Sequence, residues 1–348
     1  MKLGDKYWPL PEVRRRTGRV RQICGVRAAQ LLDGTEAGVR AIDLFNEKLR
    51  LTVYPDRGMD LGTLTWRGCP LTWESPTGVV HPTIVDTTGY GWGKGFHGGL
   101  AVSCGLENVG PPCEDGGKWY GQHGTLSYTP AADVAWREET TDTVIRTEVE
   151  GEVPGADGLS FRRKVSLVGG ANVIWVVDRI YNPTAEPIPW MIQYHMNFGF
   201  PLLSEAARVL IPPGRPLPRD EGSALGLSTW DQVQAPEPGY GEQVFRHQQK
   251  PDPRGYAYCG IVNDSLGLGV LLRYPTGPLP YLWQWRIFAP QRYVLALEPS
   301  NCLVKPRSRA REEGILPTLA PKSAIEISLQ VVVVEGREPL LRLKHLLA

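Results

Sequence analysis

The run Asn172–Ile180, NVIWVVDRI, is the strongest strand signal in the first two thirds of the chain. It is built from β-branched, aromatic and alternating residues, the composition of a pleated, half-buried strand. Similar short runs lie on both sides of it, and turn signals rich in glycine and proline separate them. The further strands expected are residues 18–30, 38–54, 63–66, 71–74, 125–128, 142–149, 159–167, 188–200, 256–262, 267–274, 281–287, 293–298 and 323–334.

This pattern predicts an all-β fold, a large antiparallel β-sandwich with few short helices. A βαβ fold is excluded because helical patterns of about 10–15 residues do not separate the strands. We expect one domain over residues 1–348, with residues 1–35 as an N-terminal extension and first strands. Residues 201–253 are rich in proline and glycine and are predicted to form a long irregular excursion. A lone helix is expected over residues 338–347.

Composition excludes several classes of function. The chain has 38 basic and 37 acidic residues, so no electrostatic capture of nucleic acid or of an anionic membrane is predicted. It has no window of about 18 apolar residues and no apolar secretory segment at its N-terminus, which predicts a cytoplasmic protein. Its six cysteines form no C-x-x-C pair and are expected to be reduced.

The glycine-rich stretch GFHGGLAVSCGLENVGPPCEDGGKWYGQHG, residues 95–124, has the character of a binding site. It holds two of the six histidines, His97 and His123, each followed directly by glycine. Polar side chains in glycine-rich connections are typical of loops that line a concave surface on a rigid scaffold. We therefore expect this stretch to form one wall of a site.

Two strands carry polar groups of another kind. In an extended strand Gln193, His195 and Asn197 point to one face, which suits a half-buried strand that lines a wet cavity. Glu298 ends an apolar strand just before Pro299. A histidine and a partly desolvated glutamate can act as an acid–base couple across a bound substrate, since both then titrate near the working pH.

Each of these residues also has a plainer interpretation. A single histidine in a strand is more often a hydrogen-bonded structural group, and a glutamate before proline is usually a turn residue. Convergence of His97, His123 and His195 with Glu298 would favour a site. Such a set also describes a metal centre, but no H-x-H or H-x-x-x-H spacing occurs, so no metal and no cofactor are predicted.

At these residues the sequence resembles the aldose 1-epimerase (galactose mutarotase-like) superfamily, nearest to a bacterial branch. Gly121-Gln122-His123-Gly124 is similar to the Q-H-G motif that hexose-6-phosphate mutarotases carry after a glycine-rich segment, here Gly98–Val102. Tyr194–Phe198 resembles the strand of the catalytic histidine, and Leu297–Pro299 resembles the late strand of the catalytic glutamate. The resemblance covers roughly residues 35–335 and implies a large antiparallel β-sandwich.

The resemblance also implies roles. His195 would be the acid on the ring oxygen, Glu298 the base on the anomeric hydroxyl, and His123 a sugar ligand. Arg57, in the turn P-D-R-G-M-D, is a candidate sugar contact, or else a turn residue paired with a neighbouring aspartate. His97 has no counterpart in the family and is proposed from its glycine setting alone.

Four further residues complete the predicted sugar-binding set: Gln193, Asn197, Gln284 and Trp285. Gln284 and Trp285 lie one strand before the glutamate, where an aromatic ring could stack on a sugar, although a tryptophan-rich strand is more often core. The arginine that follows Q-H-G in the hexose-6-phosphate enzymes is absent, because this chain continues Thr-Leu-Ser. A phosphorylated hexose is therefore not predicted.

The function expected from the sequence is a cofactor-independent aldose 1-epimerase that interconverts the anomers of a small sugar. Two alternatives stay open: a carbohydrate-binding protein without turnover, and a metal-assisted isomerase of keto or uronic sugars. A small-molecule sugar is the predicted partner, a homodimer is left open, and neither nucleic acid nor membrane is expected.

Overall fold

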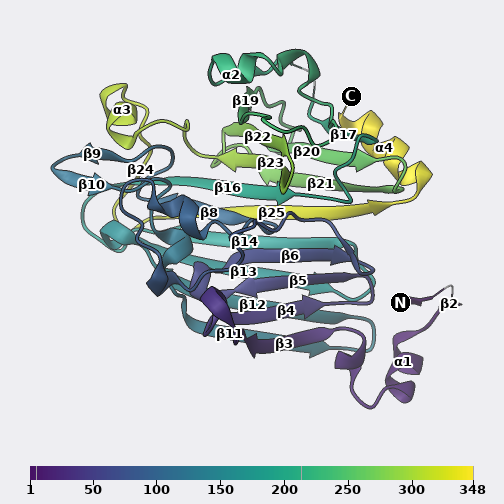
Figure 1. The fold of residues 1–348 in the computed structure, drawn as a ribbon. Coiled ribbons are helices and arrows are strands. Elements are labelled where there is room, and N and C mark those ends of the chain that lie inside the picture. The colour runs from purple at the N-terminus through teal and green to yellow at the C-terminus, as the bar shows by residue number, and fades with distance from the viewer. Residues whose placement is uncertain (5, 213, 348) are drawn as a thin grey trace.

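The structure, a computed structural model, describes residues 1–4, 6–212 and 214–347. Its strands form two layers packed face to face (Figure 1). One layer is a single antiparallel sheet of eight strands. From edge to edge these are β11 (Ala132–Thr140), β12 (Ile145–Pro154), β13 (Ser160–Val168), β14 (Val173–Tyr181), β25 (Ala324–Glu335), β21 (Leu268–Pro275), β20 (Tyr256–Asn263) and β17 (Ala207–Leu210).

The second layer consists of two antiparallel sheets. One contains β3 (Gly25–Gln30), β4 (Arg40–Phe45), β5 (Leu49–Tyr54), β6 (Asp60–Trp66) and β7 (Cys69–Pro70). The other runs in the order β18 (Leu217–Pro218), β19 (Gln243–His247), β22 (Tyr281–Ala289), β23 (Arg292–Ser300), β16 (Met191–Phe198) and β8 (Val102–Leu106). Backbone bonds between Leu61 and Ala101 join the two sheets.

Short strand pairs and helices lie outside the three large sheets. Two-stranded pieces are β1 (Lys2–Leu3) with β2 (Lys6–Tyr7), β9 (Cys113–Asp115) with β10 (Lys118–Tyr120), and β15 (Ile188–Pro189) with β24 (Thr318–Leu319). The α-helices in the described ranges are α1 (Leu10–Arg16), α2 (Glu221–Ala224), α3 (Arg307–Glu312) and α4 (Arg337–Leu347). No helix there is long and apolar enough to cross a membrane.

Strand alternation explains why the layers pack. Along β13 and β14 every second side chain is buried, among them Phe161, Val165, Ile174 and Ile180. Apolar residues of all three sheets belong to one contiguous core, which removes their side chains from water. A shift of one residue in register would turn these side chains to solvent, so the pattern fixes the register.

The predicted all-β sandwich is confirmed, as is the C-terminal helix, α4. The predicted strand over 125–128 is wrong: residues Leu126–Tyr128 form a 3₁₀ turn, closed by the bond from Tyr128 N to Thr125 O. The segment 201–253 is more regular than expected, because β17 adds to one layer while β18 and β19 add to the other. Helix α1 was not predicted, since only Leu10 and Val13 of its residues are buried.

Candidate active site

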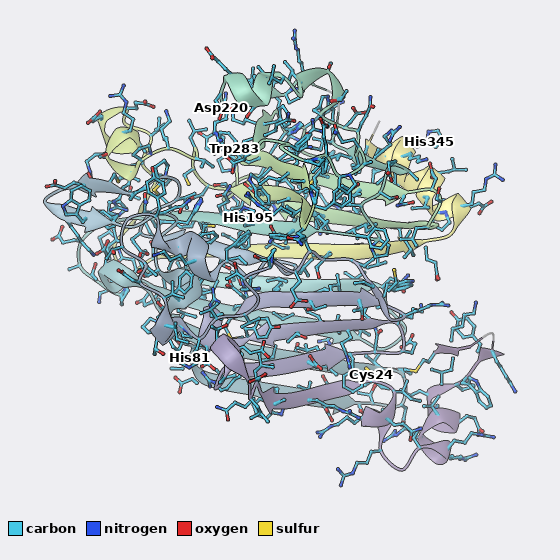
Figure 2. The ribbon with its side chains drawn as sticks, viewed as in Figure 1. Cys24, His81, His195, Asp220, Trp283 and His345 are labelled. Carbon is cyan, nitrogen blue, oxygen red and sulfur yellow. The ribbon has the colours of Figure 1, made fainter. Side chains whose placement is uncertain are left out.

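His195 and Glu298 face each other across two neighbouring strands. The β16–β23 register pairs Gln193 with Ser300 and Met196 with Leu297, which sets His195 opposite Glu298. The two side chains meet at 3.0 Å, Nε2 to Oε1, and both are buried. Gln193 Nε2 donates to Glu298 Oε2 at 2.5 Å. Figure 2 shows His195 in the middle of the sheet, with Trp283 and then Asp220 above it.

Asn197 fixes the tautomer of His195. Its Nδ2 donates to two backbone carbonyls, those of Gly99 at 3.2 Å and of His195 at 2.7 Å. Carbonyl oxygens only accept, so the amide orientation is determined, and Asn197 Oδ1 is the atom that lies 2.6 Å from His195 Nδ1. His195 Nδ1 therefore carries a hydrogen, and Nε2, which lies 3.0 Å from Glu298 Oε1, is the nitrogen without one.

Burial sets the charges of the pair. It lowers the pKa of His195 to about 4, with the bond to Asn197 as a smaller opposing cause. It raises the pKa of Glu298 to about 8, and the negative charge of Glu242 adds to that rise. Glu298 Oε1 is buried, and among the described residues it has no hydrogen-bond partner; its contact with His195 Nε2 is a close approach. At neutral pH the pair thus holds one proton, carried by Glu298.

The pair lies on the floor of a cavity of about 550 Å³. Aromatic rings pack around the histidine: Phe96 is 4.9 Å and Trp285 5.1 Å from His195, centroid to centroid, both edge to face. The lining residues are Tyr90, Trp92, Gly93, Phe96, Gly110, Pro111, Gln122, His123, Gln193, His195, Arg219, Glu242, Val244, Trp285, Arg292, Glu298 and Val304.

The glycine-rich stretch forms one wall, as the sequence predicts. His123 takes a positive φ of 55°, and its neighbours allow the loop to lie directly on other backbone. A Cβ on Gly124 would lie 2.4 Å from Gly105 O, and one on Gly121 would lie 2.1 Å from Thr87 O. His123 Nδ1 accepts from Gly110 N at 3.3 Å, and burial lowers the His123 pKa to about 3. His123 is therefore neutral, with its hydrogen on Nε2.

The opposite wall is an ion-pair network. Glu242 accepts from Trp285 Nε1 at 2.7 Å and from Arg219 at 2.6 Å, and Arg219 also pairs with Asp220 at 2.8 Å. Burial tends to raise the Glu242 pKa, but the bonds from Arg219 and Trp285 outweigh it and lower the pKa overall. Glu242 is thus a carboxylate that holds the Trp285 ring in place beside His195.

Five of the nine residues predicted for the site line this cavity: His123, Gln193, His195, Trp285 and Glu298. Asn197 lies beneath it and reaches the site through His195. The remaining three do not line it: Arg57, His97 and Gln284. In the part of the chain that the structure describes, no group of three His, Cys, Asp or Glu side chains could hold a metal ion.

The three outlying residues have structural surroundings. Arg57 is fully buried and donates to the carbonyls of Ser127, Val80 and Gly95, so it ties loops together and pairs with neither neighbouring aspartate. His97 is buried 3.5 Å from Asp60. Gln284 makes no hydrogen bond to a described residue of the cavity lining. Its side chain is hydrogen-bonded to the His247 ring and to the Trp230 carbonyl.

Sequence reasoning missed three charged lining residues, Arg219, Glu242 and Arg292. Arg219 and Glu242 belong to the segment expected to be irregular, where no alternation marked a strand. Arg292 begins β23, the strand that also carries Glu298, and the even spacing of 292 and 298 was a usable signal for one shared face.

A model of the family described as "Domain of unknown function (DUF4432)" matches residues 36–333 of the chain. The chain belongs to the DUF4432 family. That match takes in all the lining residues, from Tyr90 to Val304. No protein with a curated description matches the sequence of this DUF4432 protein.

Solved structures resemble this DUF4432 protein over most of its length. A Klebsiella pneumoniae protein provisionally named an aldose 1-epimerase has a TM-score of 0.86 and 26% identity, covering 92% of this chain and 86% of its own. A galactose mutarotase-like protein from Clostridium acetobutylicum has a TM-score of 0.61 and 13% identity, covering 90% and 99%. A Salmonella typhimurium protein provisionally named a mutarotase has a TM-score of 0.59 and 11% identity, covering 92% and 96%. The predicted galactose mutarotase-like fold is confirmed.

Proposed function

We propose that this protein is a cofactor-independent aldose 1-epimerase, with Glu298 as base and His195 as acid. The observation that carries the proposal is the close approach of these two side chains, 3.0 Å from His195 Nε2 to Glu298 Oε1, on the floor of a cavity. Anomer exchange needs one group that takes a proton from the C1 hydroxyl and another that gives a proton to the ring oxygen. A pair that holds one proton can do both.

The reaction begins when the proton of Glu298 moves to His195 Nε2, which lies 3.0 Å from Glu298 Oε1. The Glu298 carboxylate then takes the proton of the C1 hydroxyl while the His195 imidazolium protonates the ring oxygen, and the bond between C1 and the ring oxygen breaks. The open-chain aldehyde rotates about C1–C2. Closure reverses both transfers and returns the proton to the pair, so the protein ends the cycle unchanged.

Groups beside the pair supply sugar contacts. Gln193 Oε1 is buried with no partner among the described residues, which makes it an acceptor for a sugar hydroxyl. His123 Nε2–H is a donor on the glycine-rich wall, because Nδ1 already accepts from Gly110. The Trp285 ring, held by Glu242, offers an apolar face on which the C–H face of a sugar can stack.

The proposal is tested by magnetisation-exchange NMR at the anomeric carbon over a panel of neutral, deoxy and acidic aldoses. We expect the protein to accelerate exchange of at least one sugar with no added metal or cofactor. Binding of a sugar, seen as line broadening, without any acceleration would instead favour the carbohydrate-binding protein without turnover.

The pKa values predict a bell-shaped dependence of exchange rate on pH. Below about 4 His195 and Glu298 both carry protons, so no base is present. Above about 8 neither does, so no acid is present. The rate should be flat between these limbs and fall tenfold per pH unit outside them, as a pair with one proton requires. A rate that rises steadily up to pH 10 would contradict the assignment.

Changing Glu242 to glutamine should move both limbs to lower pH. Its negative charge raises the pKa of both Glu298 and His195, so removing that charge lowers both values. The measurement is the pH–rate profile of Glu242→Gln against wild type. The control is Asp220→Asn, which also loses a partner of Arg219 but lies outside the cavity lining and keeps the oxygen that caps α2. The pH–rate profile of Asp220→Asn should keep both limbs at the wild-type pH values.

A further inference from the structure

The cavity lining includes β23 at two separated positions. Glu298 and Arg292 both line it, and they lie six residues apart on this one strand. An even separation puts both side chains on the same face of the sheet. With about 3.4 Å of rise per residue, their Cα atoms are about 20 Å apart. The lining therefore has a reactive end at Glu298 and a cationic end at Arg292.

One sugar ring does not span this length. The distance divides into three intervals of about 7 Å between successive same-face residues, and a pyranose ring with its substituents covers roughly one of them. The ring that reacts occupies the interval next to Glu298. Trp285 pairs with Ala296, two residues along the strand, and so provides a stacking surface at this point. The Cα separation leaves two further intervals toward Arg292, a length that matches a second sugar unit.

Arg292 differs from the other cavity arginine in having no carboxylate partner. Arg219 is held by Glu242 and Asp220 at 2.6 and 2.8 Å. The ion pairs within residues 1–4, 6–212 and 214–347 include none to Arg292, whose side chain is exposed at the end of the β22–β23 hairpin. An unpaired guanidinium on a cavity wall suits a carboxylate or phosphate, which it can bind through two parallel hydrogen bonds.

From these observations we propose that Arg292 forms an anion subsite, and that the substrate is an acidic disaccharide or longer sugar. Its reducing-end aldose lies at His195 and Glu298, and its carboxylate or phosphate lies one unit further along the cavity. The reducing-end placement rests on the proposed epimerase function. The anion subsite itself requires only the cavity and Arg292.

The test compares ligands that differ only in the distal charge. Affinities of cellobiose, cellobiouronic acid and cellobiose 6′-phosphate are measured by calorimetry at low salt, for wild type and for Arg292→Gln. We expect the better of the two acidic disaccharides to bind wild type about tenfold more tightly than cellobiose, and to lose that advantage in Arg292→Gln. The acidic disaccharide whose affinity exceeds that of cellobiose by the larger factor shows whether the subsite prefers a carboxylate or a phosphate. The matched control is Arg137→Gln, an exposed arginine on β11 in the other layer, and it should change nothing.

Three outcomes would overturn the proposal: equal affinity for charged and neutral disaccharides, an acidic preference that survives in Arg292→Gln, or no binding of any of the three. Parallel NMR exchange measurements separate it from the proposed function. Tight binding of an acidic disaccharide without faster anomer exchange would leave the subsite standing and remove the epimerase. Faster anomer exchange of glucose, with no preference for the acidic disaccharides, would support the epimerase and remove the anion subsite.

Discussion

Glu298→Gln is expected to lower the rate of anomer exchange by about 10²–10⁴-fold while leaving the fold and sugar affinity unchanged, the loss typical of a missing acid–base group. The reason lies in the resting state of the pair. Protonated Glu298 accepts at Oε2 from Gln193 and places Oε1 3.0 Å from His195 Nε2. Glutamine can keep both contacts, with its Oε1 as acceptor toward Gln193 and its Nε2 toward His195. It cannot accept the proton of the sugar hydroxyl.

The measurement combines exchange NMR with a thermal melt and a sugar titration. Glu107→Gln is the matched control, because Glu107 is also buried and burial also raises its pKa, yet it does not line the cavity. That variant should keep the wild-type rate. If Glu298→Gln exchanged anomers within threefold of wild type, the base would have to be another group.

The strand positions of His195 and Glu298 were predictable from local pattern. Alternation along 193–197 puts His195 on a polar face, and Glu298 lies in an apolar strand, although that strand continues past Pro299 to Ser300. The meeting of the two side chains was not predictable. It depends on which strands pair and in which register, here β16 with β23, and no local pattern in a single sequence encodes a partner about a hundred residues away.

Arg57, Arg219 and Glu242 are residues whose surroundings the sequence did not reveal. Arg57 was a candidate sugar contact by family resemblance, or else a turn residue paired with a neighbouring aspartate. Instead the 3₁₀ turn Pro55–Arg57 directs it inward, where three loop carbonyls satisfy its guanidinium. Arg219 and Glu242 were missed for the converse reason. They lie in a proline- and glycine-rich segment without periodicity, and only the pairing of β19 with β22 brings that segment to the site.

Asp178→Ala is expected to destabilise the protein by about 3–5 kcal/mol, because it leaves a buried arginine without its counter-charge. Arg163 donates to both carboxylate oxygens of Asp178 at 2.9 and 2.7 Å, and Tyr194 OH donates to the same carboxylate at 2.8 Å. All three side chains are fully buried between the layers. Tyr194 precedes His195 on β16, so this cluster anchors the strand that carries the proposed acid.

Denaturant unfolding measures the effect. The chain contains a matched control one residue along β13: Arg162 pairs with Glu152 at 2.7 Å, but its side chain is 50% exposed. Glu152→Ala should therefore cost no more than about 1 kcal/mol, as exposed ion pairs do. The double variant Arg163→Met with Asp178→Leu should recover most of the loss, since it removes both charges together. Equal costs for Asp178→Ala and Glu152→Ala would mean that the buried pair is hydrated and does not hold the two layers together.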